Sequence, residues 1–283
     1  MDYDDLYLCV GTISGAGFRE LVEAAAAGGY RGISIWPQHY KGAREQGLSD
    51  LDMKLMLEDH DLIIYELDPL VTWLPSPKSP SGAEPSEYEA MFDGEDFFYH
   101  IADVLGAGHL NANQAVGESI PEIDLVAEAF AGVCDRAAPH DLKVSLEFLP
   151  WSGIPDMETA LRIVRQAGCP NCGIVLDMWH HFRSGGSVDD LLALSGKDIV
   201  AIHTSDAAAQ PEEDILNETM HGRRLPGDGV IDLVGVFRAL DTIDCQAPIG
   251  VEVISDEMNG LSPLEAAVKA ADATRGVLAK SRA

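Results

Sequence analysis

Eight short runs of β-branched and other apolar residues, each followed by a longer segment with helical spacing, constrain this chain more than any other feature. Such runs predict strands, and apolar residues that recur every three or four positions predict helices. The expected strands are Leu6 to Ile13, Gly32 to Trp36, Leu62 to Leu67, His109 to Val116, Lys143 to Leu149, Cys172 to Met178, Ile199 to Ser205 and Ile249 to Ser255. The expected helices lie near 18–28, 48–60, 86–106, 121–139, 156–168, 187–195, 231–242 and 262–280.

Strict alternation of strand and helix favours a parallel α/β sheet, because each helix carries the chain back to the same end of the next strand. The strands are apolar enough to be buried on both faces, and the chain has 283 residues, near the usual size of an eight-fold barrel. We therefore predict a (β/α)8 TIM barrel that occupies residues 1–283 as a single domain. An open, doubly wound sheet is the structural alternative.

Two long connections follow predicted strands. The Pro- and Ser-rich stretch Pro75 to Pro85 comes after the third strand, and Ala207 to Gly229 comes after the seventh. In a barrel, loops in these positions surround the active site.

The charge balance excludes some classes of function. The chain has 47 Asp or Glu against 19 Lys or Arg, a formal net charge of −28, which opposes binding to nucleic acid. We find no apolar run long enough to cross a membrane, and the acidic start Met1 to Asp5 does not resemble a signal peptide. A soluble, cytoplasmic protein is expected, with no nucleic-acid or membrane partner and with a homo-oligomer as an open possibility.

The five cysteines are scattered, which fits a reducing compartment. Cys169 and Cys172 have C-x-x-C spacing, but they follow a predicted helix and precede a predicted strand, the reverse of the order expected for a redox dithiol. A zinc site would need further ligand pairs. We expect these two residues to be partly buried small side chains in a turn.

Four polar residues stand near the ends of apolar strands. They are Glu147, Asp177, His203 and Glu252, on the fifth to eighth predicted strands. Strand ends converge on the mouth of a barrel, and an isolated carboxylate in an apolar strand costs several kcal/mol unless it is paired or binds a metal. Three carboxylates and one imidazole suit a divalent cation, with Mn²⁺ or Mg²⁺ preferred and Co²⁺ or Zn²⁺ possible. The alternative is that each carboxylate pairs with a nearby Arg or Lys.

Other candidate residues surround this set. His180, three positions after Asp177, could polarise or protonate a substrate oxygen, or else orient Asp177. Candidate anion ligands are Arg183, Arg223 and Arg224, and residues that could line a substrate pocket or pack at its rim are Trp36, His39, Glu66, Trp73, Asn113 and Trp151. We find neither a dinucleotide-binding glycine motif nor a G-x-S-x-G nucleophile motif.

The segments around Glu147, Leu176 to His180, Ile202 to Asp206 and Val251 to Val253 resemble the sugar phosphate isomerase/epimerase superfamily, the xylose isomerase-like barrels. The resemblance spans nearly the whole chain and is strongest between 144 and 256. It implies a (β/α)8 barrel whose divalent metal is bound by Glu147, Asp177, His203 and Glu252. It also implies that the two Glu act as acid and base on opposite faces of a substrate carbon and that His180 contacts a substrate oxygen.

One position departs from the ketose 3-epimerases of this superfamily, which have an Arg six residues after the metal-binding His; this chain has Ala209 there. The segments Ser205 to Ala207 and His221 to Gly229 are more similar to a subgroup that contains the 3-dehydroshikimate dehydratases. In those enzymes a Gln can replace the metal-binding His, whereas this chain has His203.

Both readings share one first step. A cation that binds a ketone oxygen and its neighbouring hydroxyl stabilises an enediolate, so that a carboxylate can remove the adjacent proton at neutral pH. We therefore expect a metal-dependent isomerase or epimerase of a sugar or other polyhydroxy ketone. One alternative is a dehydratase of a cyclic hydroxyketone such as 3-dehydroshikimate or a keto-inositol, and another is a barrel that binds a metabolite without catalysis.

Overall fold

The computed structural model describes residues 5–74, 93–115, 120 and 122–283, and eight parallel strands form a closed barrel at its centre. Each strand pairs with the next along the chain, and β8 closes the barrel against β1. The strands are β1 Leu6–Leu8, β2 Gly32–Ile35, β3 Ile63–Leu70, β4 His109–Asn113, β5 Lys143–Glu147, β6 Cys172–Asp177, β7 Ile199–Thr204 and β8 Ile249–Val251. The predicted (β/α)8 barrel is confirmed, and the open sheet is excluded.

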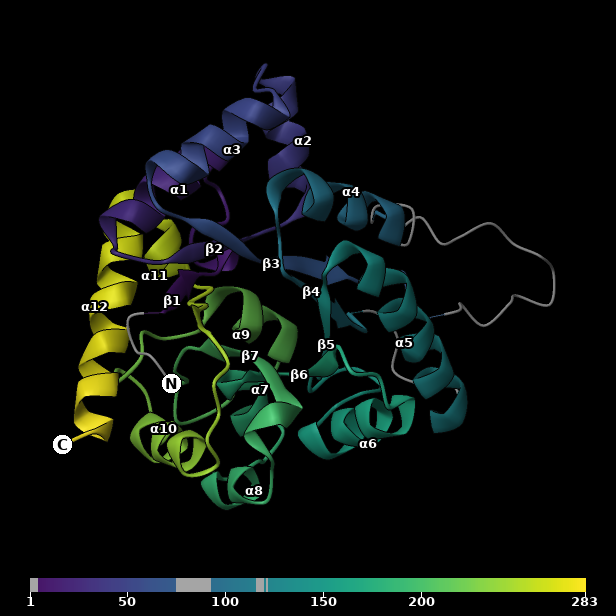
Figure 1. The fold of residues 1–283 in the computed structure, drawn as a ribbon. Helices are drawn as coiled ribbons and strands as arrows, with labels where there is room; N and C mark the ends of the chain where they lie inside the picture. The colour runs from purple at the N-terminus through teal and green to yellow at the C-terminus, as the bar shows by residue number, and fades with distance from the viewer. Residues whose placement is uncertain (1–4, 75–92, 116–119, 121) are drawn as a thin grey trace.

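Helices surround the barrel as an outer ring (Figure 1). Those that follow the predicted periodicity are α1 Phe18–Ala27, α3 Asp50–Asp59, α4 Glu95–Leu105, α5 Ile123–Ala137, α6 Met157–Ala167, α8 Val188–Leu192, α10 Leu233–Thr242 and α12 Pro263–Ser281. Two of them begin with the expected chemistry, because the Asp190 carboxylate accepts a hydrogen bond from the backbone of Ser187, and the Ser262 hydroxyl accepts one from the backbone of Glu265.

The sequence did not predict four helices of at most nine residues that follow strand ends. They are α2 Pro37–Glu45, α7 Met178–Arg183, α9 Ile215–His221 and α11 Asp256–Asn259. Segments this short show too few turns for a helical period to be visible. They matter for function because α7 and α9 lie in the loops at the mouth of the barrel.

The first strand is shorter than predicted, because β1 ends at Leu8 and residues Val10–Ile13 form a 3₁₀ turn. The turn is fully buried, so its apolar residues imitate a strand in the sequence. Thr12 in this turn takes over part of the pairing with β8: its hydroxyl donates to Val251 O and accepts from Val253 N, both at 2.9 Å.

Of the two long connections that the sequence predicts, the structure describes the one after β7. The stretch Pro75 to Pro85 lies outside the described residues. The connection after β7 carries α9 and returns to the barrel through an antiparallel bridge between Asp206 and Arg224. The Asp206 carboxylate accepts hydrogen bonds from the backbone N–H groups of Gly227, Gly229 and Ile231, which fixes this loop over the mouth.

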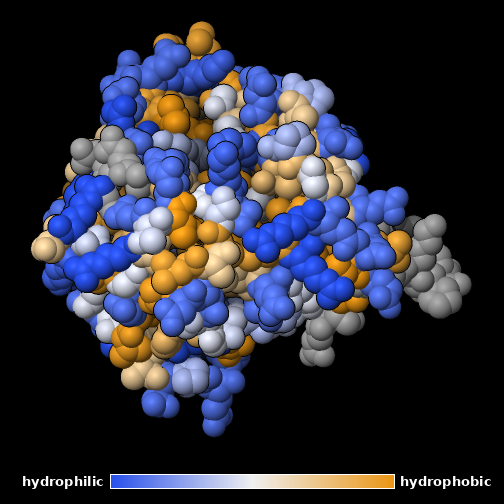
Figure 2. Space-filling model, turned by 60° about the horizontal axis from the view of Figure 1, so that its bottom comes forward, coloured by the Kyte–Doolittle hydropathy of each residue, from blue (hydrophilic) through white to orange (hydrophobic). Residues whose placement is uncertain are grey.

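Hydrophilic residues predominate on the face drawn in Figure 2, with short hydrophobic stretches between them. Large apolar residues at the surface, such as Leu51, Leu125 and Leu264, come from different helices. No helix within the described residues is long and apolar enough to cross a membrane.

Candidate active site

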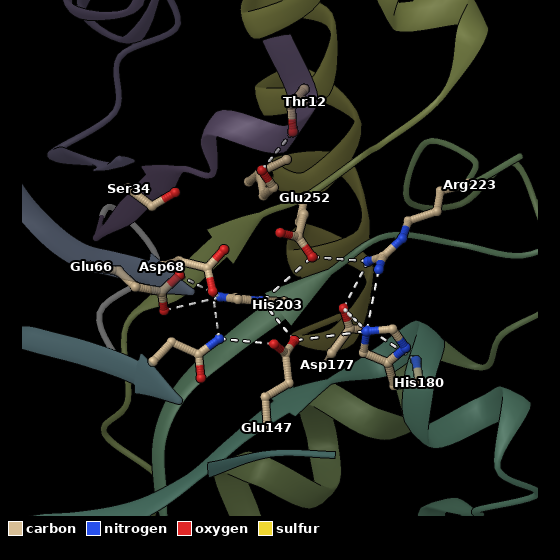
Figure 3. Close-up of polar contacts among 12 residues, drawn as sticks. Thr12, Ser34, Glu66, Asp68, Glu147, Asp177, His180, His203, Arg223 and Glu252 are labelled. Carbon is tan, nitrogen blue, oxygen red and sulfur yellow. Dashed lines mark hydrogen bonds and ion pairs between the residues drawn. The ribbon is translucent and has the colours of Figure 1, made fainter. Parts of the chain in front are cut away.

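Glu147, Asp177, His203 and Glu252 converge at the mouth of the barrel (Figure 3). Glu147 and Asp177 end β5 and β6, His203 is the penultimate residue of β7, and Glu252 directly follows β8. One ligand atom from each residue lies within 4.8 Å of the others, and all four side chains are buried. The barrel thus brings together, at the strand ends where the sequence predicted them, residues that are far apart along the chain.

His203 has one ring nitrogen available to this cluster. Its Nε2 lies 3.1 Å from both carboxylate oxygens of Glu66, which accept its proton. Its Nδ1 lies 3.6 Å from Glu147 Oε1 and 3.5 Å from Glu252 Oε2, and it is buried with no hydrogen-bond partner among the residues that the structure describes. A free imidazole nitrogen that faces two carboxylates is the arrangement a cation ligand needs.

Buried charge sets the protonation of His203. Burial acts to lower its pKa, but the Glu66 carboxylate, together with Tyr7, Cys9 and Glu252, outweighs burial and holds the pKa well above its ordinary value. Because metal ligands must be deprotonated, a cation would displace the Nδ1 proton. Glu66 is charged for the same reason: burial acts to raise its pKa, but His203 and His109 outweigh burial and keep the pKa below its usual range.

Two amides orient the Glu147 carboxylate. Asn111 and Asn113, both on β4, donate to Glu147 Oε2 at 2.8 and 3.2 Å. Its other oxygen, Oε1, faces His203 and His180. Burial acts to raise the pKa of Glu147, but the positive charge of the nearby His203 ring lowers it, which favours the carboxylate.

Asp177 is both a strand end and the N-cap of α7. Its Oδ1 accepts the backbone N–H of His180 at 2.8 Å, and its Oδ2 accepts from Arg223 Nη1 at 2.7 Å. Burial acts to raise its pKa, but the Arg223 guanidinium together with the neighbouring His180 and His203 outweighs burial and holds the pKa well below the ordinary value. Asp177 is therefore ionised at neutral pH.

Arg223 supplies positive charge inside the cluster. Its Nη1 also donates to Glu252 Oε2 at 3.0 Å, and its Nη2 donates to the Thr219 hydroxyl at 3.0 Å. The side chain is almost fully buried. The alternative prediction, that the carboxylates pair with a basic residue, thus applies to Asp177 and Glu252, which both contact Arg223. His203 Nδ1 still has no hydrogen-bond partner among the described residues.

His180 lies beside the cluster with a defined tautomer. Its Nε2 is 3.3 Å from Arg223 Nη2, and an arginine can only donate, so Nε2 accepts and Nδ1 carries the proton. That Nδ1 is buried and finds no partner within the described part of the chain. The ring of Trp151 packs edge-on against His180 with 5.3 Å between centroids.

The remaining candidate residues lie at various distances from the cluster. Trp36 Nε1 donates to Asp68 Oδ2 at 3.1 Å, and Asp68 Oδ1 accepts from Asn111 at 2.9 Å, so Trp36 is linked to the site. Arg183 instead donates to Glu218 and to Ala208 O, which ties α7 to the loop after β7. Arg224 is exposed and donates to Asp228 O.

His39 and Trp73 belong to the surroundings of the site. His39 is buried and packs against the Trp36 ring at 5.8 Å, and Trp73 Nε1 donates to Asn113 O at 2.8 Å. Trp73 thereby supports the strand that orients Glu147.

Sequence reasoning missed Asp68, Asn111 and His109. A signal existed, because Glu66 and Asp68 alternate on β3, and His109, Asn111 and Asn113 alternate on β4. Polar residues at every second position of a buried strand all point to one face. Burial raises the pKa of Asp68 well above its usual value, and the nearby Glu66, Glu147 and Glu252 carboxylates raise it further.

This arrangement can perform two tasks. The donor set could hold one divalent cation, because three carboxylates and one imidazole nitrogen share a buried centre. Two of the carboxylates, Glu147 and Glu252, also flank the same imidazole nitrogen and can exchange protons with a ligand bound there.

Comparison with known proteins gives relatives with two activities. The chain is 26% identical over 275 residues to a 3-dehydroshikimate dehydratase of Pseudomonas aeruginosa strain PAO1, which covers 95% of this chain and 41% of that protein. It is 31% identical over 160 residues to an inosose isomerase of Bacillus subtilis strain 168, which covers 56% of this chain and 55% of that protein. The chain thus spans about half the length of the curated relatives it matches.

Solved structures share the fold. A crystal structure of the IOLI protein with a binding zinc atom superposes with a TM-score of 0.85 at 24% identity and covers 98% of both chains. A family model described as a xylose isomerase-like TIM barrel matches residues 22–277. This chain belongs to the xylose isomerase-like TIM barrel family.

Proposed function

We propose that this protein is a divalent-metal-dependent isomerase or epimerase that acts on a cyclic polyhydroxy ketone through an enediolate intermediate. The observation that carries the proposal is the pair of buried carboxylates, Glu147 and Glu252, that flank His203 Nδ1. One carboxylate can remove a proton next to the carbonyl and the other can return it. Similarity to the inosose isomerases supports a cyclic substrate of the keto-inositol type.

Glu147, Asp177, His203 and Glu252 would hold the cation. When bound, it would polarise the ketone and stabilise the negative charge of the enediolate. The oxygen-rich donor set favours Mn²⁺ or Mg²⁺, and the zinc atom in the related IOLI structure makes Zn²⁺ an alternative with Co²⁺.

The protein's own residues divide the remaining work. Glu147 Oε1, free of the two asparagine amides, accepts the proton, and Arg223 orients Glu252. His180 turns Nε2 toward Glu147 and Asp177, so this ring nitrogen is the one positioned to contact a substrate oxygen. The rings of Trp151 and Trp36 provide apolar surface next to His180 and Asp68.

Dehydration is the second candidate. The dehydratase of Pseudomonas aeruginosa matches 95% of this chain, a greater share than the inosose isomerases match. The same proton removal would be followed by loss of a hydroxyl from the β-carbon, which yields a conjugated ketone. The two reactions therefore differ only after the first step.

Proton NMR in D₂O separates these reactions. The purified protein is incubated with inosose and with 3-dehydroshikimate, with Mn²⁺, Mg²⁺, Co²⁺ or Zn²⁺ added in turn. Deuterium at a carbon next to the carbonyl of an intact ring supports the isomerase. A new conjugated product with ultraviolet absorbance supports the dehydratase. Absence of both across a panel of ketoses and cyclic hydroxyketones would contradict catalysis and favour the non-catalytic binding alternative.

The Glu147→Gln variant tests the assigned base. We expect kcat to fall by about 10²- to 10⁴-fold, because the amide keeps the shape of the side chain but cannot accept the proton. Glu158→Gln on the exposed face of α6 is the matched control and should leave kcat unchanged. Equal activity of wild type and Glu147→Gln would exclude this role.

A further inference from the structure

Three cysteines gather at the end of the barrel opposite the active site. Cys134 is near the C-terminus of α5, Cys169 follows α6, and Cys172 is the first residue of β6. Their three sulfur atoms lie within 4.8 Å of one another. Since β6 begins at Cys172 and ends at Asp177, the cluster is separated from the active site by about 16 Å along the strand, at about 3.3 Å a residue.

The sequence alone does not reveal that a third cysteine, Cys134, lies beside the C-x-x-C pair. The C-x-x-C pair lies as predicted, after a helix and before a strand, and by itself it lacks a partner. The packing of α5 against α6, side by side in Figure 1, brings Cys134 to the pair. The thiols at the end of α5, just after α6 and at the start of β6 therefore lie close together.

Bonds other than those of the thiols hold this geometry. The Asn171 amide, between the two cysteines of the pair, donates to Cys134 O at 3.0 Å and to Leu142 O at 3.1 Å. These bonds fasten the turn to the end of α5. Gly168 ends α6 with a positive φ of 66°, which a glycine adopts without strain and which directs the chain into Cys169. The cluster is therefore pre-formed.

We propose that Cys134, Cys169 and Cys172 form a binding site for a thiophilic d¹⁰ cation, Zn²⁺ or Cu⁺, separate from the catalytic centre. A metal–sulfur bond of about 2.3 Å places ligand sulfurs about 3.8–4.0 Å apart in tetrahedral or trigonal geometry. The observed sulfur separations, all within 4.8 Å, need little adjustment. Thiolates select soft cations, whereas the carboxylate-rich mouth suits harder ones, so the two sites would take different metals.

The cluster is open to solvent on one side. Cys134 is fully buried, but Cys169 and Cys172 are partly exposed. Cys172 also lines a hollow of about 410 Å³ beside Pro170, Asn171 and Pro248. Metal binding would release the protons that the thiols carry.

Cadmium titration tests the site, because a thiolate–cadmium bond produces an ultraviolet charge-transfer band that carboxylates and imidazole do not. The protein is stripped of metal by a chelator, kept reduced, and titrated with Cd²⁺. We expect a band that saturates at one equivalent. Competition with Zn²⁺ and, without oxygen, with Cu⁺ identifies the preferred ion. Absence of the band in the wild type would overturn the proposal.

Cysteine variants locate the site. Cys134→Ser and Cys172→Ser should each weaken Cd²⁺ binding at least about tenfold, since loss of even an outer partner of a metal ligand costs 10- to 100-fold. Cys245→Ser, a buried cysteine outside the cluster, is the matched control. Cys9→Ser is a second control, because Cys9 lies beside His203 and Glu252.

Two results with these variants would contradict the proposal. A band that persists in Cys172→Ser, or one that disappears in Cys9→Ser, would place the cadmium elsewhere. Cys134 is in the core, so its variant is compared with wild type by circular dichroism. If it does not fold, Cys169→Ser, at a partly exposed position, replaces it with the same expected loss.

Discussion

At the scale of single residues, Arg223 compensates the negative charge of the buried carboxylates. Its guanidinium contacts Asp177 and Glu252, and its side chain is 2% exposed. Buried charges of one sign cost several kcal/mol unless an opposite charge compensates them. Arg223 therefore acts as a resident counter-charge, and a divalent cation would add to it.

Arg223→Met should destabilise the metal-free protein by about 3–5 kcal/mol, because it leaves Asp177 and Glu252 without a buried partner. A divalent cation should then restore stability, by about 2.7 kcal/mol at 100 times its Kd, and at one fixed concentration by more than it adds to the wild type. Urea unfolding with and without Mn²⁺ measures both effects.

The neighbouring Arg224 is the control for this experiment, since it has the same side chain but is exposed. Arg224→Met should change stability by less than about 0.5 kcal/mol, with or without the cation. If Mn²⁺ stabilises Arg223→Met no more than it stabilises wild type, the counter-charge role is wrong.

At the scale of elements, the 3₁₀ turn after β1 holds the strand end that bears Glu252. The Thr12 hydroxyl donates to Val251 O and accepts from Val253 N, one residue on each side of Glu252, and Glu252 N donates to Thr204 O at 3.0 Å. The backbone of Glu252 is thus clamped from both neighbouring elements. A regular strand through Ile13, as the sequence predicted, would have placed no side-chain hydroxyl there.

Thr12→Val should cost about 1–3 kcal/mol, because it leaves the buried N–H of Val253 without its partner. Displacement of Glu252 should also weaken binding of the divalent cation about tenfold. Urea unfolding and calorimetric titration with Mn²⁺ measure the two effects. Thr12→Ser keeps the hydroxyl and should preserve cation affinity; a loss as large as that of Thr12→Val would argue against the clamp.

At the scale of the whole molecule, the excess of acid acts against the fold. A net charge of −28 on 30.4 kDa repels itself more in the compact state than in the unfolded chain. Exposed ion pairs such as Arg31 with Asp61 oppose this repulsion only weakly. Monovalent salt screens exposed charges, and the screening length falls from about 30 Å at 0.01 M to about 8 Å at 0.15 M.

We therefore expect Tm to rise by about 2–4 °C, the shift that corresponds to about 1 kcal/mol in a chain of this size, when NaCl increases from about 10 to about 150 mM. Differential scanning calorimetry measures it. Glu147→Gln should show the same salt dependence, because Glu147 is buried beyond the reach of screening. A Tm that falls with salt would mean that exposed ion pairs outweigh the net repulsion.

The sequence by itself determined the barrel and the four residues at its mouth. Strand and helix periods are local, and a closed parallel barrel places every strand end on one side, so Glu147, Asp177, His203 and Glu252 could be grouped without coordinates. The same reasoning failed at residues 10–13, where a buried turn and a strand have the same apolar composition.

Only the tertiary structure decided which side chains touch. Glu66 and His203 meet across 137 residues and fix the free nitrogen of the imidazole, Arg223 reaches Asp177 across 46, and Cys134 joins Cys169 and Cys172 through the packing of two helices. The physical reason is that such pairs depend on side-chain direction and on helix packing, neither of which leaves a periodic trace in the sequence.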